Sequence, residues 1–270
     1  MFVVRSAIVT LEARTQRCPK FTKRMLLYCS NHSAGKKLIK RHKDCFYFLK
    51  VLMKSTETEQ MNCPEFTPQE ELANIIIHFL GIVFGVVAIP FLITEAANES
   101  TSHFISISVY ALCFLMLFCF STLYHSIKNY KRKCLYEKLD RISIYFLIAG
   151  TYTPIIRFYL YDNIGIMLLC VLWILVAAGI AFEIFFPNKF NTFSVIFYLI
   201  MGLIFIFVPG HFFAAMPSAI VALVLAGVIL YCVGIIFYLW QKWNFHHAIW
   251  HFFVLIAGIC HFIAMLQTVA

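Results

Sequence analysis

From residue 72 onward the chain alternates long apolar segments with short polar turns. Each apolar segment has roughly 17 to 25 residues, the length that an α-helix needs to cross the hydrocarbon core of a bilayer. The segments lack the in-and-out alternation of a membrane barrel strand and are too long for one. The pattern therefore predicts an all-α integral membrane protein, a seven-transmembrane helix bundle. The approximate predicted spans are 72–94, 104–127, 139–157, 164–186, 192–208, 218–240 and 247–267.

The composition agrees with an integral membrane protein. Hydrophobic residues make up 61% of the chain and charged residues only 13%, which is far from the balance of a soluble domain. The formal net charge of +9 could indicate a nucleic-acid binder, but residues 1–60 hold 13 Lys and Arg against 4 Asp and Glu, and the rest of the chain is neutral overall. Because the excess charge is confined to this basic leader, no nucleic-acid partner is expected.

We predict two parts, a basic leader over residues 1–60 and a seven-helix transmembrane domain over residues 61–270. The leader contains only short apolar pieces such as FYFLKVLM, which cannot span a bilayer, and it lacks the pattern of a signal peptide. We interpret it as a disordered segment or as an extended start, with Met53 and Met61 as alternative first residues.

The orientation follows from the charges of the loops, because basic loops stay in the cytoplasm. The connection between the first and second predicted helices carries only Glu95 and Glu99. With seven crossings we expect a cytoplasmic N-terminus, an extracytoplasmic C-terminus and a location in the cell membrane among membrane lipids. The basic residues of the connection between the second and third helices are Lys128, Lys131, Arg132, Lys133, Lys138 and Arg141.

Several polar residues share the cytoplasmic ends of the predicted helices. His125 lies at the end of the second helix, Asp140 at the start of the third, and His247 and His251 at the start of the seventh. His247 and His251 are four residues apart, as are Ser121 and His125, so each pair lies on one helix face. Ionisable residues inside a bundle are costly unless they are used. This grouping therefore indicates a functional site, although the alternative is that such residues only satisfy one another at the membrane interface.

The remaining histidines fit this site less well. His246 is rotated from His251 by about 140° on a helix, and His261 lies about 15 Å further along the axis. His78 lies about two turns into the first predicted helix, and its interpretation stays open between a site residue and a packed core histidine.

Three neutral imidazoles from two helices form the ligand set of an open zinc site, in which water or substrate takes the fourth position. We therefore predict zinc as the cofactor and His125, His247 and His251 as its ligands. Asp140 suits the role of a base for the water, and Ser121 suits that of its hydrogen-bonding partner. Cysteines are not predicted as ligands, because the chain has no CxxC pair.

Four blocks of the sequence resemble the signature blocks of the hemolysin III family, the bacterial branch of the progestin and adipoQ receptor group. They are EELANIIIHFLG at 70–81, STLYHS at 121–126, LDRISIYFLIAGTYTP at 139–154 and HHAIWHFFVLIAG at 246–258. The resemblance extends over about residues 65–270. It implies a seven-helix bundle with a cytoplasmic N-terminus, a zinc ion bound by the same three histidines, and Asp140 and Ser121 near its water.

Three classes of function stay open on this basis. The site favours a zinc-dependent hydrolase of a lipid amide or ester, similar to a ceramidase. The second class is a receptor-like transducer or membrane homeostasis protein with structural zinc. The third is a pore-forming haemolysin, which the apolar helices disfavour because they offer no polar stripe to line a channel. Fold analogy alone does not choose among them.

Overall fold

The structure is a computed structural model of the chain, and it describes residues 66–186 and 191–269. All regular secondary structure within these two ranges is helical. The predicted leader, residues 1–60, lies outside the described residues. The longer helices are α4 (Pro68–Glu99), α5 (Thr101–Ser126), α6 (Tyr130–Tyr159), α7 (Asn163–Phe185), α8 (Asn191–Gly202), α10 (Ser218–Leu239) and α11 (His246–Val269). The 3₁₀ helix η1 (Ile204–Phe207) and the short helix α9 (Pro209–Phe213) connect α8 to α10.

The start of several helices is explained by a polar side chain that accepts a hydrogen bond from the first turn. Thr67 and Glu70 form a capping box at the start of α4, and Ser100, Asn129 and Asp162 cap α5, α6 and α7 through their side chains. Such caps satisfy backbone N–H groups that have no partner within the helix. These four helices therefore begin at positions that the local sequence specifies.

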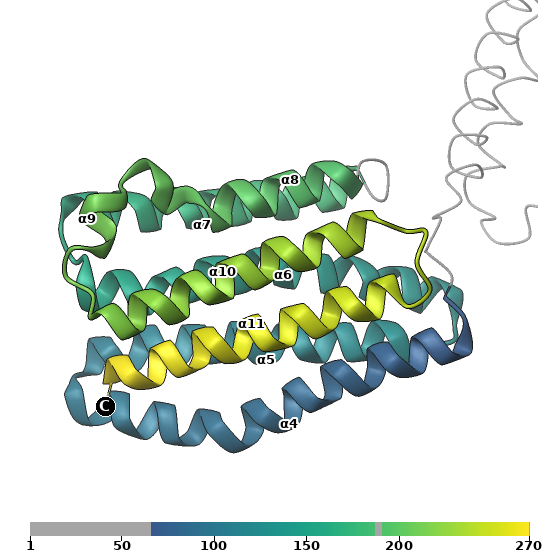
Figure 1. The fold of residues 1–270 in the computed structure, drawn as a ribbon, viewed down its shortest axis with the longest axis horizontal. Coiled ribbons are helices and arrows are strands. Elements are labelled where there is room, and N and C mark those ends of the chain that lie inside the picture. The colour runs from purple at the N-terminus through teal and green to yellow at the C-terminus, as the bar shows by residue number, and fades with distance from the viewer. Residues whose placement is uncertain (1–65, 187–190, 270) are drawn as a thin grey trace, which may run out of the picture. The chain divides into compact units, whose positions relative to one another are not determined.

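The helices form one bundle in which the first and last described helices are neighbours. α5 packs between α4 and α6, and α11 packs between α10 and α4. α7 packs against α6, and α8 contacts α6, α7 and α10. Figure 1 shows α4 and α11 beginning at the same end of the bundle, where α5 ends and α6 begins. The polar ends of four helices therefore meet at one end.

Aromatic side chains fill the centre of the bundle between α4, α5 and α11. Phe114 lies with its ring centroid 4.7 Å from that of Phe118 and 6.1 Å from that of Phe262. A Cβ atom at Gly81 would lie 2.2 Å from Cδ1 of Phe118, so only glycine lets α4 approach α5 this closely. This packing holds α4 and α11 against the middle of α5.

The outward faces of the helices are apolar. On α4, for example, Val86, Val87 and Phe91 are exposed at 60%, 62% and 67%. Five of the described helices are long and apolar enough to cross a membrane, namely α4, α5, α7, α10 and α11. A bundle with several such helices and an apolar exterior is a multi-pass integral membrane protein.

Two helices differ most from the spans predicted from the sequence. α6 begins at Tyr130 rather than at 139, because its basic residues are good helix formers and the helix continues through them from the Asn129 cap. α8 ends at Gly202, and the chain continues as η1, so the predicted span 192–208 is not one continuous helix. Because α6 carries many charges and α8 is short, neither belongs to the five apolar helices above.

Candidate metal centre

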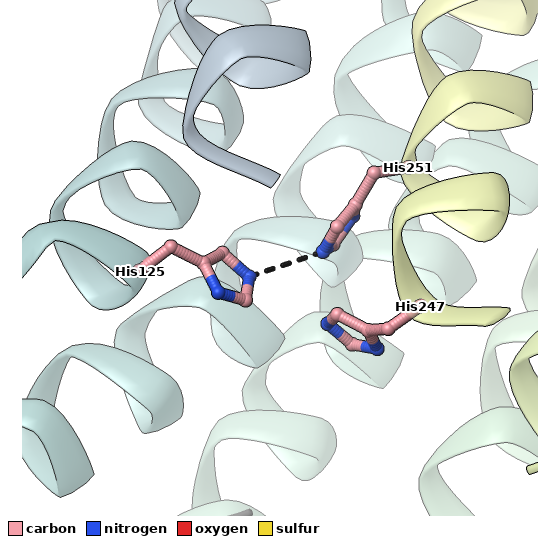
Figure 2. Close-up of side chains that lie close together, drawn as sticks. All are labelled: His125, His247 and His251. Atoms are coloured by element: carbon pink, nitrogen blue, oxygen red, sulfur yellow. Dashed lines mark hydrogen bonds between the residues drawn. The ribbon is translucent and has the colours of Figure 1, made fainter. Parts of the chain in front are cut away.

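Three histidines converge at the end of the bundle where α4 and α11 begin. Each of His125, His247 and His251 offers one ring nitrogen, and these nitrogens all lie within 4.8 Å of one another. The Nε2 atoms of His125 and His251 are 3.2 Å apart. Figure 2 shows the three rings pointing toward a common centre, one from α5 and two from α11.

Helix geometry places these rings. His247 and His251 lie one turn apart on the first two turns of α11, with ring centroids 4.3 Å apart, and His125 lies in the last turn of α5. The ring of Phe66 stacks on that of His247 at 4.6 Å. His125 and His251 are almost completely buried, at 3% and 4% exposure, so their ring nitrogens must find partners inside the bundle.

The partner of the second nitrogen of His125 decides which nitrogen faces the centre. Nδ1 lies 2.6 Å from Oε2 of Glu71, and a carboxylate only accepts, so Nδ1 carries the hydrogen and donates it. Nε2 is then unprotonated, and its lone pair is directed at His251. The side-chain amide of Asn74 lies 3.3 Å from the same Nδ1.

The donor set could hold a metal ion, and the spacing of one of its nitrogen pairs matches that of zinc ligands. Two nitrogens bound at 2.0–2.1 Å to a tetrahedral ion lie about 3.3 Å apart, close to the 3.2 Å between the Nε2 atoms of His125 and His251. Nε2 of His247 is buried and has no hydrogen-bond partner among the described residues. Neutral imidazoles with a carboxylate behind one of them are typical of zinc sites that keep a position open for water or substrate.

Asp140 and Ser121, the two predicted catalytic residues, lie beside each other. Ser121 is fully buried one turn before His125, and its hydroxyl approaches the Asp140 carboxyl group without completing a hydrogen bond of ordinary geometry. Asp140 lines the same cavity as His247 and His251. An unpartnered hydroxyl next to a carboxylate is an arrangement that can hold a water molecule.

This cavity has a volume of about 160 Å³ and runs through the interior of the bundle. Every described helix except α7 contributes to its lining. His247, His251 and Asp140 lie at the end near the start of α11, whereas His261, more than two helical turns along α11, lines it further inside. Most of the cavity wall between the polar end and His261 is apolar, because it is formed by side chains of α8 and α10 such as Leu199 and Val228.

A family model described as "Haemolysin-III related" matches residues 66–262. The chain belongs to this family. The curated "Hemolysin-3 homolog" of Bacillus subtilis (strain 168) is 42% identical over 202 residues, covering 74% of this chain and 95% of the relative. "Hemolysin-3" of Bacillus cereus is 41% identical over 199 residues, covering 73% of this chain and 91% of the relative. The resemblance to the hemolysin III family is thereby confirmed.

The similarity extends beyond bacteria. "Monocyte to macrophage differentiation factor" of Homo sapiens is 28% identical over 207 residues, which cover 74% of this chain and 84% of the relative. No solved structure shows a significant match.

Three further histidines in the described part of this haemolysin-III related protein, namely His246, His261 and His78, lie outside the three-histidine cluster. His246 precedes His247, and its ring centroid lies 6.2 Å away. His261 is deep in the bundle, with Nε2 3.1 Å from the backbone oxygen of Val224. His78 packs edge-on against His251 with centroids 4.1 Å apart, and neither of its ring nitrogens has a hydrogen-bond partner among the described residues. His78 is therefore next to the site and faces the cavity.

Sequence reasoning missed the ionic partners around the site. Lys133, assigned only to a basic loop, donates from Nζ to Oε1 of Glu71. Glu183 on α7 pairs with Arg141 on α6, although nothing in its apolar segment indicated a partner. Glu137, four residues before Arg141, carried a helical spacing signal that was available in the sequence.

Proposed function

We propose that this haemolysin-III related protein uses zinc, held by His125, His247 and His251, to hydrolyse an amide or ester bond of a membrane lipid. The observation that carries the proposal is the position of the three-histidine cluster at one end of a largely apolar cavity that also contains Asp140. A site of this kind combines a metal-binding group with space for a hydrocarbon chain.

His125, His247 and His251 would hold the zinc ion, which would supply polarisation of a carbonyl oxygen and a lowered pKa, toward ~7, for a water molecule at the site. The Asp140 carboxylate accepts the proton that the attacking water loses, and Ser121, beside Asp140, orients that water through its hydroxyl. When the carbon–nitrogen or carbon–oxygen bond breaks, Asp140 returns the proton to the leaving amine or alcohol. The carboxylate is thereby regenerated for the next turnover.

The cavity supports a lipid as the substrate. Apart from its polar end, its lining consists mainly of aliphatic and aromatic residues of α6, α8 and α10, for example Ile144, Leu203 and Ile235. A hydrocarbon chain in the bilayer is already out of water, so its transfer to such an apolar wall costs little, whereas a polar substrate would have to give up its hydration. The cleavable bond then lies near the histidines while the chain extends toward His261.

The same proposal includes the topology. In addition to the five apolar helices, α6 crosses the membrane. The segment made of α8, η1 and α9 also crosses it, as an interrupted helix, which gives seven crossings in total. The N-terminus is cytoplasmic, because the basic start of α6 lies at the same end of the bundle as the start of α4. The C-terminus is extracytoplasmic, and the protein is located in the cell membrane.

Metal analysis and a lipid hydrolysis assay on the purified protein test the function. The protein should carry about one zinc ion per chain, as a single three-ligand site requires, and should release fatty acid from lipid amides or esters in mixed micelles. A folded His247→Ala, His251→Ala double variant should lose both properties, whereas His246→Ala should keep them. Full zinc content in the double variant contradicts the site. A protein that binds zinc but hydrolyses none of the lipids tested contradicts the proposed enzymatic activity and favours a transducer with structural zinc.

A further inference from the structure

The first turn of α4 carries two adjacent carboxylates, one bound to a histidine of the cluster and the other to the backbone just before α11. Glu71 binds the ring of His125 at the end of α5, and Glu70 binds the backbone at the start of α11. The two helices that carry the three histidines are therefore both attached to one helical turn. None of the proposed metal ligands lies on α4.

Glu71 controls the ring of His125 directly. Its Oε2 accepts from Nδ1 of His125 at 2.6 Å, and its Oε1 accepts from Nζ of Lys133 at the start of α6. The ammonium group of Lys133 also lies 5.2 Å above the ring of Tyr124, which in turn contacts His125 with centroids 4.4 Å apart. The carboxylate is thus held on the side away from the cluster and fixes both the tautomer and the orientation of the imidazole.

Glu70 controls the start of α11. Its Oε1 accepts from the backbone N–H of Phe245 at 3.0 Å, while its Oε2 accepts from the backbone N–H of Thr67 at 2.9 Å in the capping box. Phe245 has φ of 60°, a left-handed conformation that is strained for a bulky L-residue. It lies two residues before His247, so the bond to Glu70 stabilises the turn that sets where α11 begins.

We propose that Glu71 and Glu70 are positioning residues of the metal centre: Glu71 orients His125, and Glu70 fixes the start of the helix that carries His247 and His251. This inference rests on the proposed zinc site and adds the groups that organise it. Carboxylates behind a ligating imidazole raise its basicity as well as fixing its direction. The first turn of a helix is also a favourable place for negative charge.

The test compares Glu71→Gln with Glu95→Gln, an exposed glutamate at the other end of the same helix. Zinc affinity is measured by competition with a chelator, and the coordination geometry is measured by the visible absorption of the cobalt-substituted protein. Glu71→Gln should bind zinc about 10- to 100-fold more weakly and should show a changed cobalt spectrum. Glu95→Gln should match the wild type in both. A purely structural role of Glu71 would lower thermal stability without changing the spectrum.

The outcomes separate this inference from the proposed function. A wild-type protein without zinc overturns both. A wild type that binds zinc, together with Glu71→Gln that keeps wild-type affinity and spectrum, overturns the positioning role of Glu71 alone. If Glu71→Gln does not fold, Lys133→Met takes its place, because this variant removes the ion-pair partner of Glu71 and keeps the carboxylate. A changed cobalt spectrum of Lys133→Met supports the positioning role of Glu71, and an unchanged spectrum overturns it.

Glu70 is tested through the strained turn. Glu70→Gln should weaken zinc binding by a smaller factor than Glu71→Gln, because it acts through the backbone. Glycine adopts positive φ without strain, so the same substitution should have less effect in a Phe245→Gly background. Equal losses of affinity in both backgrounds, or no loss in either, overturn the role assigned to Glu70.

Discussion

Arg141 donates from Nε to Oε2 of Glu183 at 2.9 Å, a buried ion pair that joins α6 to α7. The same guanidinium donates from Nη1 to Glu137 at 2.7 Å, and Ser194 on α8 donates to the other oxygen of Glu183 at 2.6 Å. Three helices are therefore connected through one buried charge cluster. It lies directly beside Asp140, so it stabilises the wall of the cavity next to the proposed catalytic carboxylate.

Arg141→Met should strongly destabilise the bundle. It leaves two buried carboxylates without their shared cation, and removal of one partner of a buried pair costs about 3–5 kcal/mol. The melting temperature in detergent should fall clearly below that of the wild type. Lys138→Met, on the same helix but outside this cluster, should melt close to the wild type. Equal melting temperatures for both variants would show that α6 and α7 do not depend on this pair.

Gly227→Ala should destabilise the packing of α10 on α11. A Cβ atom at position 227 would lie 2.3 Å from both Cδ2 and Nε2 of the buried His261 ring, and that nitrogen is held by the Val224 oxygen. Overpacking of this kind typically costs about 1–3 kcal/mol. Gly202→Ala is the matched control, because a Cβ atom there meets nothing within 4 Å. A melting temperature for Gly227→Ala equal to that of Gly202→Ala would contradict the close packing.

Zinc occupancy should decrease on acidification. Only deprotonated imidazole binds a metal, and an unperturbed imidazole has a pKa of about 6.5. Protons therefore compete with zinc as the pH falls through that value and below it, and occupancy is retained above it. The zinc content of the protein is measured after equilibration at a series of pH values across this range. The His246→Ala variant should show the same dependence of zinc content on pH as the wild type. An occupancy that does not change with pH would exclude histidine ligation.

Asp140→Asn should keep the metal and lose hydrolysis. The substitution removes the group that accepts the proton but leaves the three histidines unchanged, and loss of a general base typically lowers the rate by about 10²- to 10⁴-fold. Zinc content and lipid hydrolysis are measured on the same preparation. Undiminished hydrolysis would remove Asp140 from the proposed mechanism, and loss of zinc would instead indicate that Asp140 supports the metal.

A reporter fused after the last residue should be extracytoplasmic. The proposed topology has seven crossings with the basic start of α6 inside, so an alkaline phosphatase fusion should be active and a green fluorescent protein fusion dark. The opposite pattern would show that the crossings formed by α6 or by the broken α8 segment are miscounted.

Helix positions were largely predictable from the sequence because they depend on local properties. The predicted span 218–240 corresponds to α10 (Ser218–Leu239) and the span 247–267 to α11 (His246–Val269). The length of an apolar run is readable along the chain. The start of α6 was misplaced, since hydropathy marks the edge of the membrane and a helix formed by charged residues continues beyond it.

The family resemblance and the helical membrane class could be derived from the amino-acid order alone. So could the pairing of His247 with His251, because a spacing of four residues places two side chains on one helix face. The partners of the charged and polar side chains, in contrast, are visible only in the folded bundle. Glu71 is 54 residues from His125, and Glu183 is 42 residues from Arg141, so no local periodicity connects them. Such pairs depend on how each helix is rotated about its axis in the bundle, and that rotation follows from the packing of all neighbouring helices together.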